Sequence, residues 1–212
     1  TYINGKLHSI DGSICKIYNR NGNISMEGTY FDGKFHSING SICKEYYKNG
    51  NIKYEGTYEN GHFKSINEES ICKVYYENGK MKLEGTFIND KLESINDSIC
   101  KGYYENGNKF FVGTFKNGNP HSINEESICK VYYENGNIKM EGTIENNDLH
   151  SINGSICKGY YPNGEIKTEG TFKNGKIHSI NGSICKTYYE NGEIKAEGLS
   201  LIHISEPTRL RS

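Results

Sequence analysis

The chain has 212 residues, of which 34% are hydrophobic, and it contains 25 Gly but only 3 Pro and no Trp. Its 25 Lys and Arg and 26 Asp and Glu are interleaved and give a net charge of −1. The sequence therefore lacks the clustered basic surface of nucleic-acid-binding proteins, and no apolar run reaches the ~18 residues that a membrane-spanning helix needs.

One tetrapeptide, Ser-Ile-Cys-Lys, recurs along almost the whole chain. Its cysteines are Cys15, Cys43, Cys72, Cys100, Cys129, Cys157 and Cys185, in steps of 28 or 29 residues. A fixed period in this range is typical of repeat architectures, in which each unit packs mainly on its neighbours. We therefore predict an all-β fold, an elongated repeat array built as a single-layer antiparallel sheet or solenoid of stacked hairpins, with 28–29 residues per repeat.

The repeats divide the chain in order. A partial repeat covers residues 1–12, and further repeats start at residues 13, 41, 70, 98, 127, 155 and 183. The opening Thr1-Tyr2 matches the Thr-aromatic step inside each repeat, and no initiator Met or signal peptide precedes it. We therefore expect residues 1–198 to be one repeat array that is an internal part of a longer repeat protein.

The second repeat illustrates the predicted strands. Residues 41–47 and 52–58 are rich in β-formers and flank Asn49-Gly50. Asn-Gly between alternating runs is a strong hairpin signal, because a type I′ turn needs positive φ at both central residues. The structural turn residues predicted in this way are Asn49, Gly50, Asn78, Gly79, Asn106, Gly107, Asn135, Gly136, Asn163 and Gly164.

A two-residue loop also fixes the register of the two strands. It would place Cys43 opposite Gly56 and Tyr46 opposite Lys53, with an opposed Lys–Glu pair between these levels in most repeats. A small Cys thus meets Gly at the same level of every repeat. The groove that remains is expected to be filled by aromatic rings from adjacent strands.

Two further turns complete the repeat. Asn60-Gly61 and its relatives predict a second hairpin, whereas the segment Lys34–Gly40 and its copies vary in length, which is typical of a surface turn. If all three turns were simple hairpins, Cys would change faces in alternate repeats. We infer that only the strands with Ser-Ile-Cys-Lys and Glu-Gly-Thr form the regular sheet, and that the segment 34–40 turns a corner or makes a bulged excursion.

Paired tyrosines are the candidate contact surface. The second Tyr of each pair is expected to pack against the next hairpin, and the first to lie beside Lys on the outer face. The candidate partner-binding residues are Tyr46, Tyr75, Tyr103, Tyr132, Tyr160 and Tyr188. An exposed Tyr/Lys stripe suits a protein or glycan partner, since Tyr is enriched at interfaces; the alternative is that the rings only hold the sheet together.

The seven equivalent cysteines are interpreted as small buried thiols. If successive repeats are offset by two strands, equivalent Cys lie ~10 Å apart, beyond the ~7 Å limit for a disulfide. His lies near Cys in most repeats, as in His36 and Cys43, but zinc needs four ligands and each repeat offers at most two. A catalytic thiol would be unique and have a positioned base. We therefore predict no catalytic, cofactor-binding or metal-binding residue.

The pattern stops after Glu197-Gly198. Leu199–Arg209 (LSLIHISEPTR) resembles the translation of a transposase-type sequencing adapter. We interpret residues 199–212 as a non-native tail of a metagenomic sequence and exclude them from the fold.

The string YYxNGxIKxEGTFxNGK resembles the MORN repeat variant of bacterial proteins, including the family of YwqK-like antitoxin components. The resemblance covers seven segments: Tyr18–Lys34, Tyr46–His62, Tyr75–Lys91, Tyr103–Asn119, Tyr132–Asp148, Tyr160–Lys176 and Tyr188–Gly198. The family's usual unit is shorter than this one. The resemblance implies an antiparallel sheet of stacked hairpins used for scaffolding or binding, with no catalytic residues to carry over.

These observations favour a non-enzymatic repeat scaffold for protein–protein interaction, on a bacterial surface or secreted. One alternative is an intracellular, cytoplasmic immunity or antitoxin-like protein, which rests on the family label. Another is a cell-wall or glycan-binding module. It ranks last because such hairpin repeats use Trp heavily and this chain contains no Trp. The expected partner is a protein whose identity the sequence does not reveal.

Overall fold

The computed structural model describes residues 1–199. Apart from one single-turn 3₁₀ helix, η1 (Ile38–Gly40), every helix or strand in this part of the chain is a β-strand. The chain forms two compact units. Residues 1–108 and 115–118 make up the N-terminal unit, and residues 109–114 and those from 119 onward make up the C-terminal unit. Residues 199–212, which we interpret from the sequence as a non-native tail, lie outside the described residues except for residue 199.

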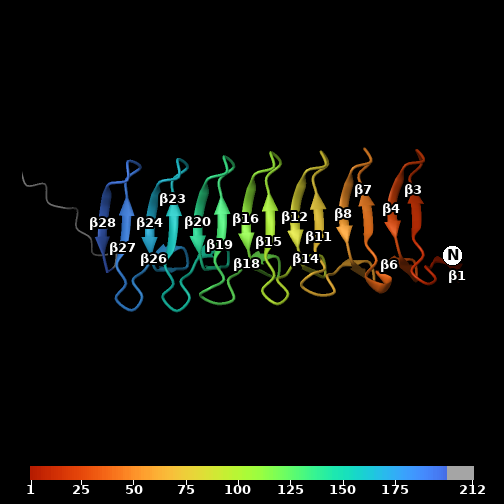
Figure 1. The fold of residues 1–212 in the computed structure, drawn as a ribbon, viewed down its shortest axis with the longest axis horizontal. Coiled ribbons are helices and arrows are strands. Elements are labelled where there is room, and N and C mark those ends of the chain that lie inside the picture. Colours follow the sequence, from red (N-terminus) through yellow and green to blue (C-terminus); the bar gives the residue numbers. More distant parts are fainter. Residues whose placement is uncertain (200–212) are drawn as a thin grey trace, which may run out of the picture. The chain divides into compact units, whose positions relative to one another are not determined.

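Each repeat contributes one long hairpin to a sheet (Figure 1). The long strands of the N-terminal unit are β3 (Cys15–Tyr18), β4 (Ile24–Gly28), β7 (Cys43–Tyr46), β8 (Ile52–Gly56), β11 (Cys72–Tyr75), β12 (Met81–Gly85) and β15 (Cys100–Tyr103). Those of the C-terminal unit are β16 (Lys109–Gly113), β19 (Cys129–Tyr132), β20 (Ile138–Gly142), β23 (Cys157–Tyr160), β24 (Ile166–Gly170), β27 (Cys185–Tyr188) and β28 (Ile194–Gly198).

Within each unit the long strands lie in chain order. The order is β3-β4-β7-β8-β11-β12-β15 in the N-terminal unit and β16-β19-β20-β23-β24-β27-β28 in the C-terminal unit. Neighbouring strands are antiparallel, both inside a hairpin, as in β7 and β8, and between hairpins, as in β8 and β11. The predicted all-β fold of stacked antiparallel hairpins is therefore confirmed.

The register agrees with the prediction at the base of the hairpin and differs near its tip. Cys43 lies opposite Gly56, as expected, but Tyr46 lies opposite Ile52 instead of Lys53. The pairing shifts between Glu45 and Tyr46, because Lys53 is an extra residue in its strand. This is a β-bulge, in which two residues of one strand oppose one of the other.

The bulge compensates for a loop of three residues where a two-residue turn was predicted. The N–H of Tyr47 donates to the carbonyl of Asn51 (2.8 Å), and that of Gly50 donates to the carbonyl of Tyr47 (3.0 Å). Within residues 47–51 only Gly50 has a positive φ, of 90°. This is a type I turn closed by a Gly in the left-handed region, and the predicted type I′ turn is wrong here. The carboxamide oxygen of Asn49 accepts the N–H of Asn51 (3.0 Å), which stabilises the turn.

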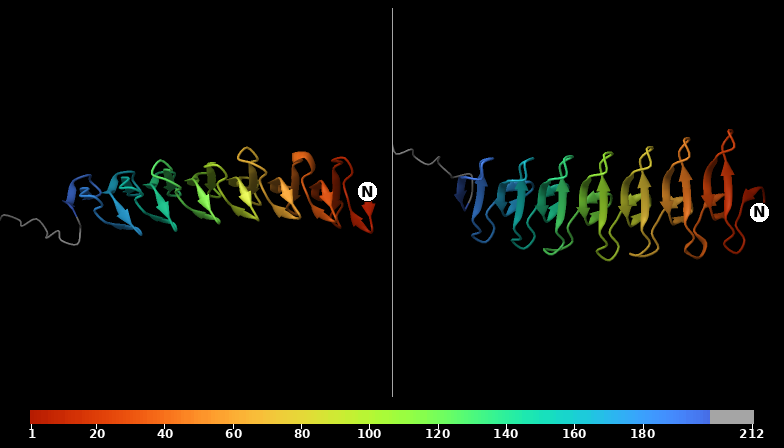
Figure 2. Two further views of the ribbon diagram at one scale, coloured as in Figure 1. Left: turned by 90° about the horizontal axis from the view of Figure 1, so that it is seen from below. Right: turned by 45° about the horizontal axis from the view of Figure 1, so that its top comes forward.

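Pairs of shorter strands precede the first long hairpin and lie between successive long hairpins in the chain, on one face of the long strands (Figure 2). In the N-terminal unit they are β1 (Tyr2–Ile3), β2 (Lys6–Leu7), β5 (Tyr30–Phe31), β6 (Lys34–Phe35), β9 (Tyr58–Glu59), β10 (His62–Phe63), β13 (Phe87–Ile88), β14 (Lys91–Leu92) and β17 (Phe115–Lys116). In the C-terminal unit they are β18 (Asn119–Pro120), β21 (Ile144–Glu145), β22 (Asp148–Leu149), β25 (Phe172–Lys173) and β26 (Lys176–Ile177).

These short hairpins have the type I′ turns that the sequence predicts. Tyr58 pairs with Phe63, and the tip residues Asn60 and Gly61 both have positive φ, 53° and 89°. The next segment makes a turn and adds no strand to the large sheet, as inferred. In the first such segment of a full repeat, this turn is η1.

The core lies between the long sheet and the short hairpins. We call the sheet face that carries Cys43 the covered face and the opposite one, which carries Lys44, the open face. A Cβ added to Gly56 would lie 2.6 Å from the Sγ of Cys72 in the next repeat and 2.8 Å from the ring of Phe63. Thiol and ring therefore occupy the space that the missing side chain leaves, and the expected filling by aromatic rings is observed at this glycine.

Aromatic rings continue this core along the N-terminal unit. Tyr30, Phe35, Tyr58, Phe63 and Phe87 stack in sequence, with centroids 4.8, 5.0, 4.8 and 4.9 Å apart. All five are buried. Burial of aromatic rings in this geometry supplies much of the stabilisation of such a narrow core.

Buried and half-buried hydroxyl groups form hydrogen bonds within each repeat and to the next one. The Ser37 hydroxyl accepts the N–H of Tyr58 (2.9 Å), and the Ser37 N–H donates to the Tyr58 carbonyl (2.8 Å). The hydroxyl of Thr29 donates to the carbonyl of His36 (2.6 Å). Equivalent bonds recur in later repeats and satisfy backbone groups that the turn would otherwise leave buried without partners.

Gly56→Ala tests the contact between glycine and thiol. The new methyl group would collide with the thiol of Cys72 and the ring of Phe63, so the free energy of unfolding should fall by about 1–3 kcal/mol. Urea unfolding followed by circular dichroism measures this change. Gly182→Ala, where a Cβ meets nothing within 4 Å, is the control and should cost only about 1 kcal/mol from its positive φ. Equal, small effects of the two changes would contradict the close contact.

Asn147→Gly tests the type I′ turns. Asn147 has φ of 70° at the position where most repeats place Gly, and Gly adopts this conformation without steric cost. The change should raise the free energy of unfolding by about 0.5–1 kcal/mol. Gly61→Asn, at the equivalent position, should lower it by a similar amount in the same urea experiment. A result of the same sign for both variants would disprove this turn geometry.

Candidate interaction surface

Oppositely charged side chains alternate across the open face. In the N-terminal unit the paired positions run Lys16, Glu27, Lys44, Glu55, Lys73, Glu84 and Lys101. In the C-terminal unit Val112 is followed by Lys130, Glu141, Lys158, Glu169, Lys186 and Glu197. Ion pairs such as Lys44–Glu55 (3.5 Å) and Lys101–Glu84 (2.6 Å) are partly solvated. Each contributes little to stability, but their alternation prevents a block of like charge from forming on this face.

The structure places the candidate tyrosines beside these charges. Tyr75 donates its hydroxyl to Glu55 (2.9 Å), Tyr160 to Glu141 (2.8 Å), and Tyr188 similarly to a glutamate of the preceding repeat. Burial, followed by the hydrogen bond to Glu55, raises the pKa of Tyr75 to about 12. These rings are half-buried, so they both join repeats and present an edge to solvent.

The second tyrosine of each pair lies at the tip of its hairpin. Tyr47 donates its hydroxyl to the carbonyl of Tyr75 (2.8 Å), and Tyr133 donates to the carbonyl of Tyr160 (2.9 Å). The bulge brings Lys53 over the Tyr47 ring, 6.0 Å from its centroid. We expected Lys53 to lie beside the first tyrosine of the pair, Tyr46. This expectation is wrong, because the bulge places Lys53 over the second tyrosine, Tyr47.

A row of isoleucines on the open face was missed by the sequence reasoning. Each comes from Ser-Ile-Cys-Lys, and alternation from Lys44 and Tyr46 places Ile42 on the open face. The row consists of Ile14, Ile42, Ile71 and Ile99 in the N-terminal unit and of Ile128, Ile156 and Ile184 in the C-terminal unit, which are between 38% and 58% exposed. The signal was present in the sequence, because an apolar residue occurs at this position in every repeat.

The thiols and histidines do not form a site. Cys43 contacts the Ser37 hydroxyl (3.8 Å) and is fully buried, and burial raises the pKa of its thiol. Within residues 1–199 no three His, Cys, Asp or Glu side chains are placed to hold a metal ion. The cysteines are all free.

No helix long and apolar enough to cross a membrane occurs in the described part of the chain.

Fold and surface together define the class of protein: a β-hairpin repeat protein that presents the same side chains many times over. The chain belongs to the MORN repeat variant family, as the sequence resemblance implied. The family's sequence model matches residues 41–60, 68–89, 97–117, 125–146, 155–174 and 183–200, more than half of the chain. Residues 18–34, which also resemble the repeat, are not among these segments. MORN repeats commonly serve as protein-interaction and scaffold modules and are generally not enzymes. The chain has no match among curated proteins.

An alkaline titration tests the bond between repeats. The pKa of Tyr75 is raised from 10.0 to about 12 in the folded chain, so the folded state holds this proton more tightly than the unfolded state. The free energy of unfolding should therefore fall as pH rises from about 10 to about 12, and Tyr75→Phe should make this fall less steep. Urea unfolding at several alkaline pH values measures it. Tyr18→Phe, at the same position of the first repeat but exposed, is the matched control. Equal slopes for parent and Tyr75→Phe would contradict the bond.

Proposed function

We propose that the chain is a non-enzymatic scaffold that binds a protein partner through its open face, in a bacterial surface or secreted setting. The observation that carries the proposal is the row of exposed isoleucines. A single exposed apolar residue needs no explanation, but a contiguous apolar patch on a soluble protein is typical of an interaction site.

The neighbouring rows support this use of the face. The half-buried tyrosines lie beside the charge row, and Tyr is enriched at protein interfaces whereas Lys and Glu are depleted. The charges on this face are paired within the chain, as in Lys130–Glu141 (3.3 Å). Isoleucine and tyrosine thus supply the contacts, and the alternating charges leave no block of like charge that would repel a partner.

The repeated spacing suits a partner with its own periodic contacts. Equivalent residues recur every two strands, about 10 Å apart. A partner that contacts several repeats gains affinity from each, and its contacts act together because the second and later ones form within one complex. The proposed scaffold therefore depends on several isoleucines at once.

A triple substitution tests the proposal: Ile42→Ser, Ile71→Ser and Ile99→Ser. Each buried isoleucine contributes about 1.5–3 kcal/mol to an interface, so retention of a specific partner should fall at least about tenfold. The measurement is quantitative mass spectrometry of proteins that the immobilised full chain retains from bacterial extract, with circular dichroism to verify the fold.

The matched control changes three exposed isoleucines outside this row: Ile10→Ser, Ile66→Ser and Ile123→Ser. These lie in the turn segments and should leave the retained proteins unchanged. Loss of the same proteins from both triple variants, or from neither, would exclude the isoleucine row as the binding surface.

A further inference from the structure

One row of the covered face differs from repeat to repeat. It lies one level nearer the hairpin tip than the Cys–Gly pairs, and its opposed residues are Ile17 with Met26, Glu45 with Tyr54, Val74 with Leu83, Val131 with Met140, Gly159 with Thr168, and Thr187 with Ala196. We call this set the variable row. The Cys–Gly pairs beside it are the same in these repeats. The fold therefore tolerates many side chains at the variable row.

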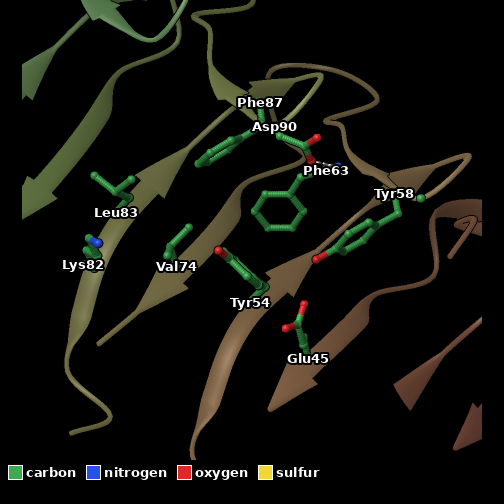
Figure 3. Close-up of a pocket in the computed structure, with 10 residues that line it drawn as sticks. Glu45, Tyr54, Tyr58, Phe63, Val74, Lys82, Leu83, Phe87 and Asp90 are labelled. Carbon is green, nitrogen blue, oxygen red and sulfur yellow. Dashed lines mark hydrogen bonds between the residues drawn. The ribbon is translucent and has the colours of Figure 1, made fainter. Parts of the chain in front are cut away.

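A half-open pocket of about 360 Å³ lies over the variable row in the N-terminal unit. Its floor includes Tyr54 of the second repeat and Val74 and Leu83 of the third. The rings of Phe63 and Phe87 from the short hairpins form the opposite wall (Figure 3). This volume lies at the small end of the range for ligand pockets and suits one aromatic ring.

The hydroxyl of Tyr58 faces this pocket and has no hydrogen-bond partner within residues 1–199. Tyr58 is only 8% exposed and lines the pocket, and its hydroxyl points toward Glu45 and Tyr54 (Figure 3). It makes no hydrogen bond within residues 1–199, and neither does the hydroxyl of Tyr54. Burial raises the pKa of Tyr58, so the group stays a neutral phenol that can both donate and accept. A hydroxyl that the chain leaves unpaired beside a pocket is available to a ligand, and a hydrogen bond to it adds to the affinity of that ligand.

The charged groups around the pocket are already engaged within the chain. Glu45 accepts a hydrogen bond from the Lys53 ammonium (2.8 Å). Asp90 accepts the N–H of Phe63 (2.7 Å) and contacts a histidine ring. The Lys82 ammonium lies 5.4 Å from the centroid of the Tyr76 ring. The groups free to recognise a ligand are thus aromatic faces, aliphatic side chains and two hydroxyls, which together fit an uncharged phenol ring.

We infer that this pocket binds a tyrosine side chain of a protein that contacts the covered face, and that the variable row sets which side chains each part of the array accepts. The inference rests on the proposed function, because the ligand is part of a protein. The fourth repeat shows how the row changes the surface. Phe111 occupies the position equivalent to Leu83 and is itself buried, 1% exposed, so the fourth repeat carries a larger buried side chain at this position.

The first test titrates the isotope-labelled full chain with N-acetyl-tyrosinamide and follows its amide signals by NMR. Signals of residues around Tyr58 and Leu83 should shift and saturate. Tyr58→Phe should weaken binding about fivefold, the effect of one neutral hydrogen bond. Tyr30→Phe is the matched control, because it likewise removes a tyrosine hydroxyl that has no partner in the described residues, but Tyr30 does not line this pocket. It should leave binding unchanged.

The second test fills the pocket with a ring that the chain already uses elsewhere. Leu83→Phe copies Phe111 and should reduce binding at least tenfold. If the larger ring disturbs the core, the double variant Val74→Gly with Leu83→Phe copies the pair of residues that the fourth repeat carries, Gly102 and Phe111. Met140→Leu, in the same row of another repeat, should bind like the parent.

Three results would overturn the inference. They are no saturable shift with the parent chain, equal binding by the filled variants, and tighter binding of methyl glucoside than of the tyrosine probe. None of them bears on the isoleucine row, which these variants leave intact. A failure here therefore remains distinguishable from a failure of the proposed scaffold, which the isoleucine substitutions test separately.

Discussion

The contact between a cysteine thiol and the bare backbone of a glycine is the constraint on which each repeat depends. At Gly28, Gly56, Gly85, Gly113, Gly142 and Gly170 an added Cβ would lie 2.5–2.7 Å from the Sγ of the next cysteine. No larger side chain fits at the glycine, and a larger one than Cys would separate the hairpins. Because the contact recurs at each of these six glycines, it holds successive hairpins in the same register.

Much of the fold follows from local patterns. The period, the hairpins and the pairing of Cys43 with Gly56 depend on alternation and on Asn-Gly steps, which act over a few residues. The type of turn could not be predicted from the local sequence, because Asn49-Gly50 and Asn60-Gly61 are the same dipeptide and adopt different turns. The difference arises from the hydrogen bonds of Asn49 and from the bulge at Lys53, neither of which a dipeptide encodes.

The candidate surface was only partly predictable for a different reason. Alternation placed Tyr46 on the outer face, but the exposure of Ile42 depends on which face the short hairpins cover, and that is a tertiary property. The variable row beside Cys43 is visible in the sequence as loss of identity between repeats. That the row lines a pocket beside Tyr54 and Tyr58 becomes apparent only in the three-dimensional structure. The open face thus presents nearly the same side chains in each repeat, whereas the variable row of the covered face presents different ones.

Thiol labelling of the native chain tests the central contact most directly. Cys15 is partly exposed, and the other six cysteines are buried against glycine, where burial raises the pKa of thiols such as Cys43 and Cys100. With a thiol reagent and mass spectrometry, Cys15 should react first. The other six should react only under conditions that unfold their repeats. Rapid labelling of several of the six in the native chain would contradict the account.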